Sequence, residues 1–331
     1  MKRIAVTGSS GYLGSALIRY LAEREPDARI LGLDIVPPKD PNRHEFVQID
    51  ILDPELAAAM RAFQPDTVVH MAFVVPPMHN ERKMRAINVE GSRNVIEAAA
   101  AVGAERLLVT SSATVFGASR DNPVPLDDSW PGRAGPQFRY AADKVELEAM
   151  VDRFAQEHPQ MAVSCVRPCI VGGPHMDNYL RRLLFSMPIV VLLDRIDSAI
   201  QLVHEEDVSA AIHQILACRG TGAYNLAPPD VVTLSEIADL TGRRCISAPF
   251  WLGWLLAWAA WKTHFPPHEY PAGFLHFVRS PWIVAANRLV GELGFRFQFS
   301  SRETLLGMLE ASALSEDVSR AHALKGPEKY N

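Results

Sequence analysis

The order of elements at the start of the chain constrains its fold more than any other feature. A short apolar run, Arg3–Thr7, is followed by the glycine-rich segment Thr7–Gly14 and by Tyr12–Arg24, whose apolar residues have helical spacing. Glycines at a strand-to-helix junction allow a tight turn and a close approach of the backbone to a ligand. The N-terminus of the following helix attracts negative charge. The chain is therefore predicted to begin with a βα unit that can bind a phosphate group.

Strands and helices are predicted to alternate through the first half of the chain, because apolar runs are separated by segments with helical periodicity. The predicted strands are Arg29–Asp34, Phe46–Asp50, Asp66–Ala72, Glu105–Ser111 and Met161–Arg167, and the predicted helices are Pro54–Phe63, Glu81–Val102 and Arg139–Gln156. Near-continuous apolar strands between helices are typical of a parallel sheet that is covered on both faces. The expected fold is α/β, a Rossmann-type doubly wound parallel sheet with a smaller mixed C-terminal substrate lobe.

The pattern becomes less regular in the second half of the chain, and the domain boundaries are predicted from this change. Gly172-Gly173-Pro174 interrupts the chain, and Glu205–Cys218 has helical spacing. Ala223–Leu226 is a short apolar run that is expected to return to the sheet. The expected parts are a nucleotide-binding domain of residues 1–175 and 203–228, a substrate lobe of residues 176–202 and 229–312, and a polar, frayed tail of residues 313–331.

Composition argues against several kinds of partner. The chain of 331 residues has a net charge of −5, which gives no reason to expect a nucleic acid. Its four cysteines form no CxxC pair and no metal-ligand spacing with histidine, so no metal site is expected. Cysteine usage and an N-terminus without a signal-like segment lead us to expect a cytoplasmic location.

One uncharged stretch, Cys245–Trp261, stands out from this soluble composition. It contains Pro249 and Gly253 and is shorter than the about 20 apolar residues that a membrane-spanning helix needs. No transmembrane span is therefore expected, whereas a peripheral contact with a membrane stays open.

A carboxylate follows the glycine-rich loop at the distance typical of dinucleotide sites. Asp34 ends the second predicted strand, about 20 positions after the loop. A carboxylate there can accept hydrogen bonds from a ribose diol and would repel a 2′-phosphate. No arginine or lysine stands beside it before Lys39. The loop could be an ordinary βα turn, but together with Asp34 we interpret it as a site for NAD rather than NADP.

Tyr140 and Lys144 place a phenol and an ammonium group four positions apart. On a helix these two side chains lie on one face. A lysine in this place can lower the pKa of a neighbouring tyrosine from its reference value of about 10. Such a tyrosine can take or give a proton at a carbinol. The pair alone would also suit a half-exposed helix face, so its significance depends on the loop that precedes it.

The order of these and further motifs resembles the extended short-chain dehydrogenase/reductases, the NAD-dependent epimerase/dehydratase superfamily. The likeness spans roughly residues 1–230, with Phe116 in place of a tyrosine as one departure. The matching segments are Thr7–Gly14 (TGxxGxxG), Asp50-Ile51, His70-Met71-Ala72 (HxA), Asn88–Asn94 (NVxGxxN), Ser111–Gly117 (SSATVYG), Tyr140–Lys144 (YxxxK), Arg167-Pro168 and His204–Val208 (HxxDV).

The resemblance implies three catalytic side chains, a bound NAD and a homodimer. Tyr140 would be the general acid/base at the substrate oxygen, Lys144 would lower the pKa of Tyr140 and bind the nicotinamide ribose, and Ser112 would orient the same oxygen. Ser111 is the less favoured serine. The dimer would use the predicted helices Glu81–Val102 and Arg139–Gln156. The residues implied in cofactor binding are Gly8, Gly11, Tyr12, Leu13, Gly14, Asp34, Asp50, Ile51, Met71, Ala72, Phe73, Asn88, Tyr140, Lys144 and Pro168.

Several motif residues also have structural explanations that the sequence leaves open. Asn88 could bridge or cap a helix, and Ser112 could cap the end of a strand. His70 ends a buried strand and is favoured as a hydrogen-bonded core histidine rather than a ligand. His204 and Asp207 are expected at the start of a helix, where a carboxylate faces the positive end of the helix dipole.

The residues after Ser112 limit which reactions of the family this chain is expected to catalyse. The family's sugar 4,6-dehydratases carry an Asp-Glu pair there, whereas this chain has Ala113 and Thr114, so dehydration is disfavoured. Simple dehydrogenation or reduction remains, as does epimerisation by oxidation and re-reduction on a retained NAD. We favour an NAD-dependent oxidoreductase that transfers hydride at a secondary alcohol or ketone.

Two isoleucines bear on the substrate. Nucleotide-sugar epimerases of the family usually have Asn and Arg where this chain has Ile170 and Ile200, and isoleucine offers no charge-assisted donor to a diphosphate. Arg181, Arg182 or Arg195 could compensate. We therefore lean to an apolar, sterol- or isoprenoid-like substrate. The alternatives are a nucleotide-sugar epimerase similar to UDP-glucose 4-epimerase, and a non-catalytic NAD-binding protein, which the intact Ser112, Tyr140 and Lys144 argue against.

Four tryptophans are spaced three, four and three positions apart, which puts them on one stripe of a helix. They are Trp251, Trp254, Trp258 and Trp261. The stripe could pack on the lobe's own core or at a dimer seam. It could also form a pocket wall for an apolar substrate, or an interfacial membrane contact. The lack of a flanking face rich in lysine and arginine weakens the membrane interpretation.

Overall fold

The computed structural model describes residues 1–185, 187–266 and 268–324, and its centre is a seven-stranded parallel sheet. The strand order is β11-β6-β5-β4-β1-β2-β3, and each neighbouring pair is parallel. This is the predicted α/β fold. The strands are β1 (Arg3–Thr7), β2 (Arg29–Asp34), β3 (Glu45–Gln48), β4 (Thr67–His70), β5 (Arg106–Thr110), β6 (Ala162–Pro168) and β11 (Gly222–Leu226).

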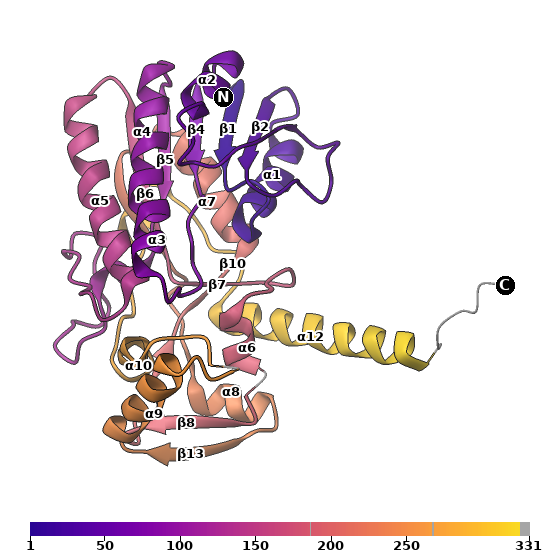
Figure 1. Cartoon of the computed structure of the whole chain (residues 1–331), viewed down its shortest axis with the longest axis vertical. Helices are drawn as coiled ribbons and strands as arrows, with labels where there is room; N and C mark the ends of the chain where they lie inside the picture. Colours follow the sequence, from indigo (N-terminus) through magenta and orange to yellow (C-terminus); the bar gives the residue numbers. More distant parts are fainter. Residues whose placement is uncertain (186, 267, 325–331) are drawn as a thin grey trace.

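Helices cover both faces of this sheet, as expected for strands that are apolar on both sides. One face packs against α1 (Tyr12–Arg24) and α7 (Glu205–Ala217). The other packs against α2 (Leu56–Phe63), α4 (Ser92–Ala101) and α5 (Arg139–Glu157). Figure 1 shows α4 and α5 on one side of the strands and α1 and α7 on the other.

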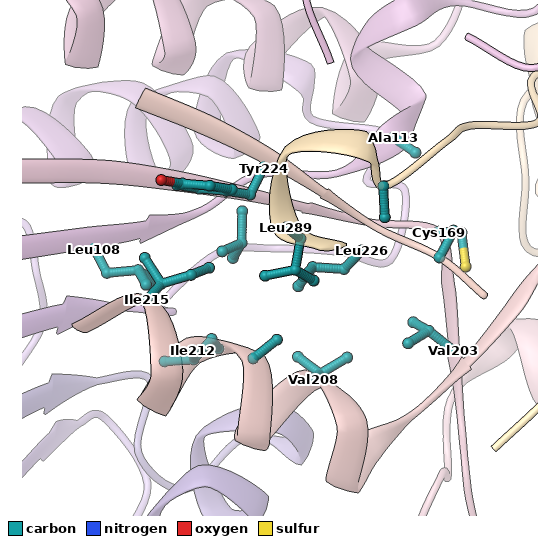
Figure 2. Packing of buried hydrophobic residues seen from close by; sticks show 14 of the residues in the cluster. Leu108, Ala113, Cys169, Val203, Val208, Ile212, Ile215, Tyr224, Leu226 and Leu289 are labelled. Carbon is teal, nitrogen blue, oxygen red and sulfur yellow. The ribbon is translucent and has the colours of Figure 1, made fainter. Parts of the chain in front are cut away.

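The two cores follow from the alternation of side chains along each strand. In β1, Ile4 and Val6 join the core beneath α1 and α7, whereas Ala5 between them joins the opposite core. Figure 2 shows the first of these cores, where Ile212 of α7 packs with Leu108 of β5. Because this packing is apolar and fully buried, it fixes the carboxyl ends of the strands relative to one another.

Most residues beyond β6, apart from α7 and β11, form a smaller lobe below the sheet. It contains the strand pairs β7–β10 and β8–β13, both parallel, and the antiparallel pair β9–β12. Figure 1 shows β8, β13, α8, α9 and α10 gathered in this lobe, while α12 extends away from it. The other elements beyond β6 are β7 (Ile170–Gly172), α6 (Tyr179–Phe185), β8 (Ile189–Leu193), β9 (Ala199–Ile200), β10 (Leu202–His204), β12 (Val232–Thr233), α8 (Leu234–Leu240), β13 (Arg244–Ala248), α9 (Phe250–Lys262), η3 (Ala272–Phe274), α10 (Leu275–Arg279), α11 (Asn287–Leu293) and α12 (Ser301–Leu324). Of these, α11 packs on the main sheet, where Leu289 joins the core beneath α7.

Two expected helices differ in detail from the prediction. The segment expected as one helix over Glu81–Val102 is helical, but it is divided into α3 (Glu81–Arg85), a π-helical turn η1 (Ala86–Gly91) and α4. The helix expected to begin at Pro54 begins at Leu56, because the carboxylate of Asp53 accepts a hydrogen bond from the Glu55 amide (2.8 Å) and forms a turn before the helix.

The C-terminal segment also differs from the expectation of a frayed tail from residue 313. Helix α12 continues without a break through Leu324, and residues 325–331 lie outside the described residues. Within the described ranges, no helix is both long enough and apolar enough to cross a membrane.

Candidate active site

A cavity of about 450 Å³ lies where the carboxyl ends of the parallel strands meet the lobe, the usual ligand position in such sheets. The end of β1 contributes Gly8, the end of β5 contributes Thr110, and the end of β6 contributes Pro168. Helix α5 contributes Tyr140 and Lys144 from its first two turns. The sheet thus brings the glycine-rich loop and the YxxxK pair to one cavity.

The glycine-rich loop requires its glycines for steric reasons. Gly8 has φ of +70°, and a Cβ built on it would lie 2.6 Å from the Ala72 amide nitrogen. A Cβ on Gly14 would overlap the carbonyl oxygen of Gly8. The loop is closed by the Gly11 amide, which donates to the Gly8 carbonyl (3.1 Å), and α1 begins directly after it. The backbone is therefore open to a ligand, with a helix N-terminus facing it.

Asp34 lies beside this loop at the end of β2. Its carboxylate accepts hydrogen bonds from the Ser10 amide (3.0 Å) and the Val36 amide (3.1 Å). The hydroxyl of Ser9 is buried near the loop without a hydrogen-bond partner among the described residues. A cradle free of side chains, a helix N-terminus and an adjacent carboxylate together fit a dinucleotide.

The cavity brings together ten of the residues expected to bind the cofactor. They are Gly8, Gly11, Tyr12, Leu13, Gly14, Met71, Phe73, Tyr140, Lys144 and Pro168. Five others lie outside its lining: Asp34, Asp50, Ile51, Ala72 and Asn88.

Asn88 has a structural partner for both ends of its amide. Its Oδ1 accepts a hydrogen bond from the Val74 amide (2.8 Å), and its Nδ2 donates to Asp143 Oδ2 (3.1 Å). Arg139 Nε donates to the other oxygen of Asp143 (2.6 Å). Burial raises the pKa of Asp143, and Asn88 and Arg139 oppose that rise. The bridge ties η1 to the first turns of α5 and so positions Tyr140.

Tyr140 lines the cavity between two aromatic rings. The ring centroids of Phe73 and Phe138 each lie 5.7 Å from the Tyr140 centroid. Burial raises the pKa of Tyr140 to about 12, and a hydrogen bond with Ser112 opposes the rise. The free protein therefore does not have the lowered Tyr140 pKa that the motif predicts, because desolvation of the phenolate outweighs the effects that favour it.

Lys144 is fully buried, and its ammonium group has two contacts. Nζ donates to the carbonyl oxygen of Thr110 (2.6 Å) and lies 3.3 Å from the centroid of the Phe73 ring, a cation–π contact. Burial lowers the pKa of Lys144 to about 7, and the nearby Cys165, Glu148 and Asp143 oppose this. Neither the Thr110 carbonyl nor the Phe73 ring was expected as a partner, since no sequence motif marks them.

Ser112 accepts hydrogen bonds from the amide (3.2 Å) and the hydroxyl (3.0 Å) of Thr114. It thereby caps the start of the short helix η2 (Ala113–Phe116), whereas the structural explanation from the sequence was a cap at the end of a strand. Because both contacts use Ser112 as an acceptor, its own proton can be directed to another oxygen. Ser111 also lines the cavity, and its hydroxyl is buried without a partner in the described part of the chain.

Three motif residues have structural roles, as the sequence favoured. His70 lies between the hydroxyls of Thr7 and Ser92, each 2.7 Å from a ring nitrogen, and burial lowers the pKa of His70 to about 3. His204 caps α7 by accepting from the Glu206 amide (3.3 Å). Asp207 accepts from the amides of Gln298 and Phe299.

The lobe side of the cavity is apolar. Ile170 and Ile200, which stand where nucleotide-sugar epimerases usually have polar residues, both line it. Lys144 and Arg243 are the charged side chains among the described lining residues, and the Arg243 guanidinium donates to the backbone carbonyls of Leu184 and Met187. The sequence did not single out several other wall residues, among them Tyr179, Leu180, Leu183, Leu184 and Val278.

The arginines considered as compensating donors lie elsewhere. Arg181 donates to Ser312 Oγ (2.8 Å), and Arg182 forms an ion pair with Glu269. Neither of them lines the cavity, nor does Arg195. No cluster of three or more histidine, cysteine or acidic side chains in the described ranges could hold a metal ion.

The tryptophan stripe lies on α9, outside the lining of the cavity. Trp251, Trp254 and Trp258 are exposed, while Trp261 stacks on His79 with ring centroids 3.7 Å apart. The interpretations of the stripe as packing in the lobe's own core and as a pocket wall are therefore wrong. Helical spacing shows that four side chains share a face, but it does not show what covers that face.

Comparison with known proteins gives three kinds of match. The family model described as "NAD dependent epimerase/dehydratase family" matches residues 4–227. An uncharacterised protein of Mycobacterium tuberculosis is 27% identical over 311 residues, covering 91% of this chain and 82% of that protein. Among solved structures, the Bordetella bronchiseptica enzyme WbmG in complex with NAD has a TM-score of 0.71 at 22% identity, covering 93% of each chain.

Two further relatives have different activities. A sterol-4-alpha-carboxylate 3-dehydrogenase of Candida albicans is 27% identical over 186 residues, covering 53% of this chain and 52% of that protein. A UDP-glucose 4-epimerase of Mycolicibacterium smegmatis is 28% identical over 196 residues, covering 54% and 58%. WbmG has also been solved with NAD and UDP.

Proposed function

Because the chain belongs to the NAD-dependent epimerase/dehydratase family, we propose that it is an NAD-dependent oxidoreductase acting at a secondary alcohol or ketone. The observation that supports this most is one cavity lined by Ser112, Tyr140 and Lys144 at one side and by the glycine-rich loop at another. The nicotinamide of a bound NAD supplies the chemistry of hydride acceptance or donation. The protein's task is to hold the reacting oxygen and to move its proton.

In the direction of reduction, Tyr140 donates its phenolic proton to the carbonyl oxygen of the substrate as hydride reaches the carbon. In oxidation the same proton returns from the substrate hydroxyl to the phenolate while hydride leaves. A pKa of about 12 keeps Tyr140 protonated at neutral pH, so the free enzyme is prepared to act as a proton donor. Ser112 orients the substrate oxygen through its hydroxyl.

In this proposal Lys144 has two roles: it binds the cofactor, and its charge influences the proton transfer by Tyr140. Its buried ammonium group lies between the Thr110 carbonyl and the Phe73 ring, at the edge of the cavity. Here it can donate to a ribose hydroxyl of the nicotinamide nucleoside, and its charge stabilises the phenolate that Tyr140 becomes in oxidation.

We propose an apolar substrate, with sterol- or isoprenoid-like secondary alcohols as the favoured class. The supporting observation is the lobe side of the cavity, where Ile170, Ile200 and several leucines and phenylalanines meet. A diphosphate would find no arginine there beyond Arg243, whose guanidinium already donates to the Thr241 hydroxyl and to the backbone carbonyls of Leu184 and Met187. Desolvating a diphosphate against such walls without charged donors is unfavourable.

The second candidate is a nucleotide-sugar epimerase. It is favoured by the UDP complex of WbmG and by the similarity to the UDP-glucose 4-epimerase of Mycolicibacterium smegmatis. A non-catalytic NAD-binding protein is less well supported, because such a protein has no need of Ser112, Tyr140 and Lys144 around one cavity.

The two catalytic candidates are separated by ligand binding. The purified protein, saturated with NAD, is heated with UDP-glucose, with UDP alone, and with a series of apolar secondary alcohols. We expect an increase in melting temperature with the alcohols that grows with their apolar area, and none with UDP. Stabilisation by UDP and UDP-glucose alone would contradict the apolar substrate, and NAD that remains bound through purification would favour the epimerase.

Two expectations about the whole chain stay part of the proposal. We propose the division into a nucleotide-binding domain of residues 1–175 and 203–228 and a substrate lobe of residues 176–202 and 229–312. We also propose a cytoplasmic location and a homodimer through the helical segments Glu81–Val102 and Arg139–Gln156; sedimentation can test the dimer.

A further inference from the structure

Helix α9 exposes an apolar face that the rest of the molecule does not cover. The exposed fractions are 66% for Trp251, 38% for Trp254, 46% for Leu255 and 45% for Trp258. These positions are spaced three, four and seven from the first, so they lie on one side of the helix. From Phe250 to Trp261 the helix carries no charged residue. A helix that is apolar all round is normally buried, which means that this face has a partner.

The inner side of α9 forms the back of the cavity wall. Ala257 packs in one cluster with Leu193 and Leu275, both of which line the cavity. Gly253 lies so close to the side chain of Leu193 that a Cβ there would approach it to 2.9 Å. One layer of side chains therefore separates the exposed indoles from the apolar interior of the proposed substrate site.

The segment that carries this face has charged side chains of one sign only. The segment Leu240–His268 contains no aspartate or glutamate, but it contains Arg243, Arg244 and Lys262. Arg244 and Lys262 are exposed, and neither forms an ion pair with another described residue. They stand at the start of β13 and at the last residue of α9. An anionic surface is the complement of such a face.

The charge distribution argues against a second copy of the chain as the partner. In a two-fold interface the same patch meets itself, so Arg244 and Lys262 would approach a surface that offers no acid from this segment. Indoles are also the side chains that favour the boundary between acyl chains and head groups. At 13 residues, α9 is too short to span a bilayer and suits lying in its plane.

We propose that the outer face of α9, with Arg244 and Lys262 beside it, docks on the surface of an anionic lipid bilayer. Docking would put the wall of the lobe against the bilayer in which an apolar substrate dissolves. In that respect the inference rests on the proposed function. Figure 1 shows α9 at the end of the molecule remote from α2, so that a membrane there would meet the lobe and not the far end of the sheet domain.

The test uses the full chain and vesicles of two compositions, phosphatidylcholine mixed with phosphatidylglycerol and phosphatidylcholine alone. Binding is measured by flotation and by quenching of tryptophan fluorescence with brominated lipid. We expect binding to the anionic vesicles that weakens with salt, and a loss of about tenfold or more in the triple variant Trp251→Ser, Trp254→Ser, Trp258→Ser. Arg244→Glu with Lys262→Glu should lower binding to the anionic vesicles and leave that to the neutral vesicles unchanged.

Matched controls separate docking from general effects on the surface. Val290→Ser removes an exposed apolar side chain from α11, and Arg61→Glu reverses an exposed charge on α2; both should bind as the original chain does. Melting temperatures show that all variants fold. No binding to either vesicle, equal binding by the triple variant, or unchanged binding after charge reversal would overturn the inference. So would a self-association in sedimentation that the triple variant loses.

Failure of the docking surface and failure of the proposed reaction can be distinguished in the same experiments. NAD affinity and the oxidation of short, water-soluble secondary alcohols are measured on the same preparations. Loss of vesicle binding with retained oxidation would leave the proposed function standing, whereas vesicle binding without any alcohol oxidation would remove the function and keep the docking surface.

Discussion

At the scale of single residues, burial rather than pairing sets the protonation of the catalytic candidates. The sequence correctly brought Tyr140 and Lys144 to one helix face, but it predicted that the lysine would lower the pKa of the tyrosine. Instead, burial raises the pKa of Tyr140 to about 12 and lowers the pKa of Lys144 to about 7. Sequence spacing carries no information on how much water the neighbouring chain removes, so this result could not be predicted from the motif.

The pKa of Lys144 predicts how stability depends on pH. Burial lowers this pKa from the ordinary lysine value of 10.5 to about 7 in the folded protein. Between these two values the unfolded chain binds more protons than the folded one, so folding gains stability as the pH rises. The burial of a charged Lys144 therefore destabilises the free protein fully below pH about 7, and this effect fades towards pH 10.5.

Replacing Lys144 by Met should remove this effect. We expect Lys144→Met to raise the free energy of unfolding of the cofactor-free protein at pH 6 by up to about 5 kcal/mol, and the gain to shrink towards zero by pH 10. Urea unfolding of both proteins across this range measures the difference. A gain that does not change with pH would contradict the pKa of about 7.

Asp34 predicts the choice between the two nicotinamide cofactors. Its carboxylate stands next to the loop, held by the Ser10 and Val36 amides. We expect tighter binding of NAD than of NADP, and a reduction of that preference by about tenfold or more in Asp34→Ser, because the repulsion of a 2′-phosphate is removed. Fluorescence titration with both cofactors measures this, with the exposed Asp27→Ser as control. Equal binding of both cofactors by the original chain would refute the assignment.

At the scale of elements, the strands were predicted well because β1, β2, β4, β5 and β6 are buried on both faces and read as continuous apolar runs. The π-helical turn was not predicted from the sequence, and neither were the hydrogen bonds that Asn88 forms there with Val74 and Asp143, because both partners are distant in sequence. Helix α2 starts two residues later than predicted, because Asp53 forms a turn before it.

The geometry of the junction between β1 and α1 predicts that stability and NAD affinity depend strongly on Gly14. In Gly14→Ala the new methyl group would overlap the Gly8 carbonyl, so α1 must move away from the loop. We expect a loss of stability of about 2–4 kcal/mol and a marked loss of NAD affinity. Gly291→Ala on α11 is the matched control: nothing lies within 4 Å of the added Cβ, and helix propensity predicts a gain of up to about 1 kcal/mol. Equal effects of the two substitutions on NAD affinity would show that the loop tolerates a side chain.

At the scale of the whole molecule, the site lies between a sheet and a lobe. The strands of the sheet could be predicted from the sequence, whereas the arrangement of the lobe could not. The pair β8–β13 joins strands about 50 residues apart in sequence, a separation at which local patterns say nothing about pairing. The tryptophan stripe was placed on one helix face correctly, but its exposure depends on which neighbours α9 lacks. The apolar wall formed by Ile170, Ile200 and the lobe was foreseen only through those two isoleucines.

In the proposed reaction, Tyr140 moves the proton of an apolar secondary alcohol at this cavity. The most direct measurement is the rate of NADH formation from a series of such alcohols with the original chain and with Tyr140→Phe, together with the NAD affinity of both. We expect turnover by the original chain, a loss of at least about a hundredfold in Tyr140→Phe, and NAD affinities within about threefold of each other. Undiminished turnover by Tyr140→Phe would contradict the proposed role of Tyr140. Oxidation of UDP-sugars and of no apolar alcohol by the original chain would contradict the proposed substrate.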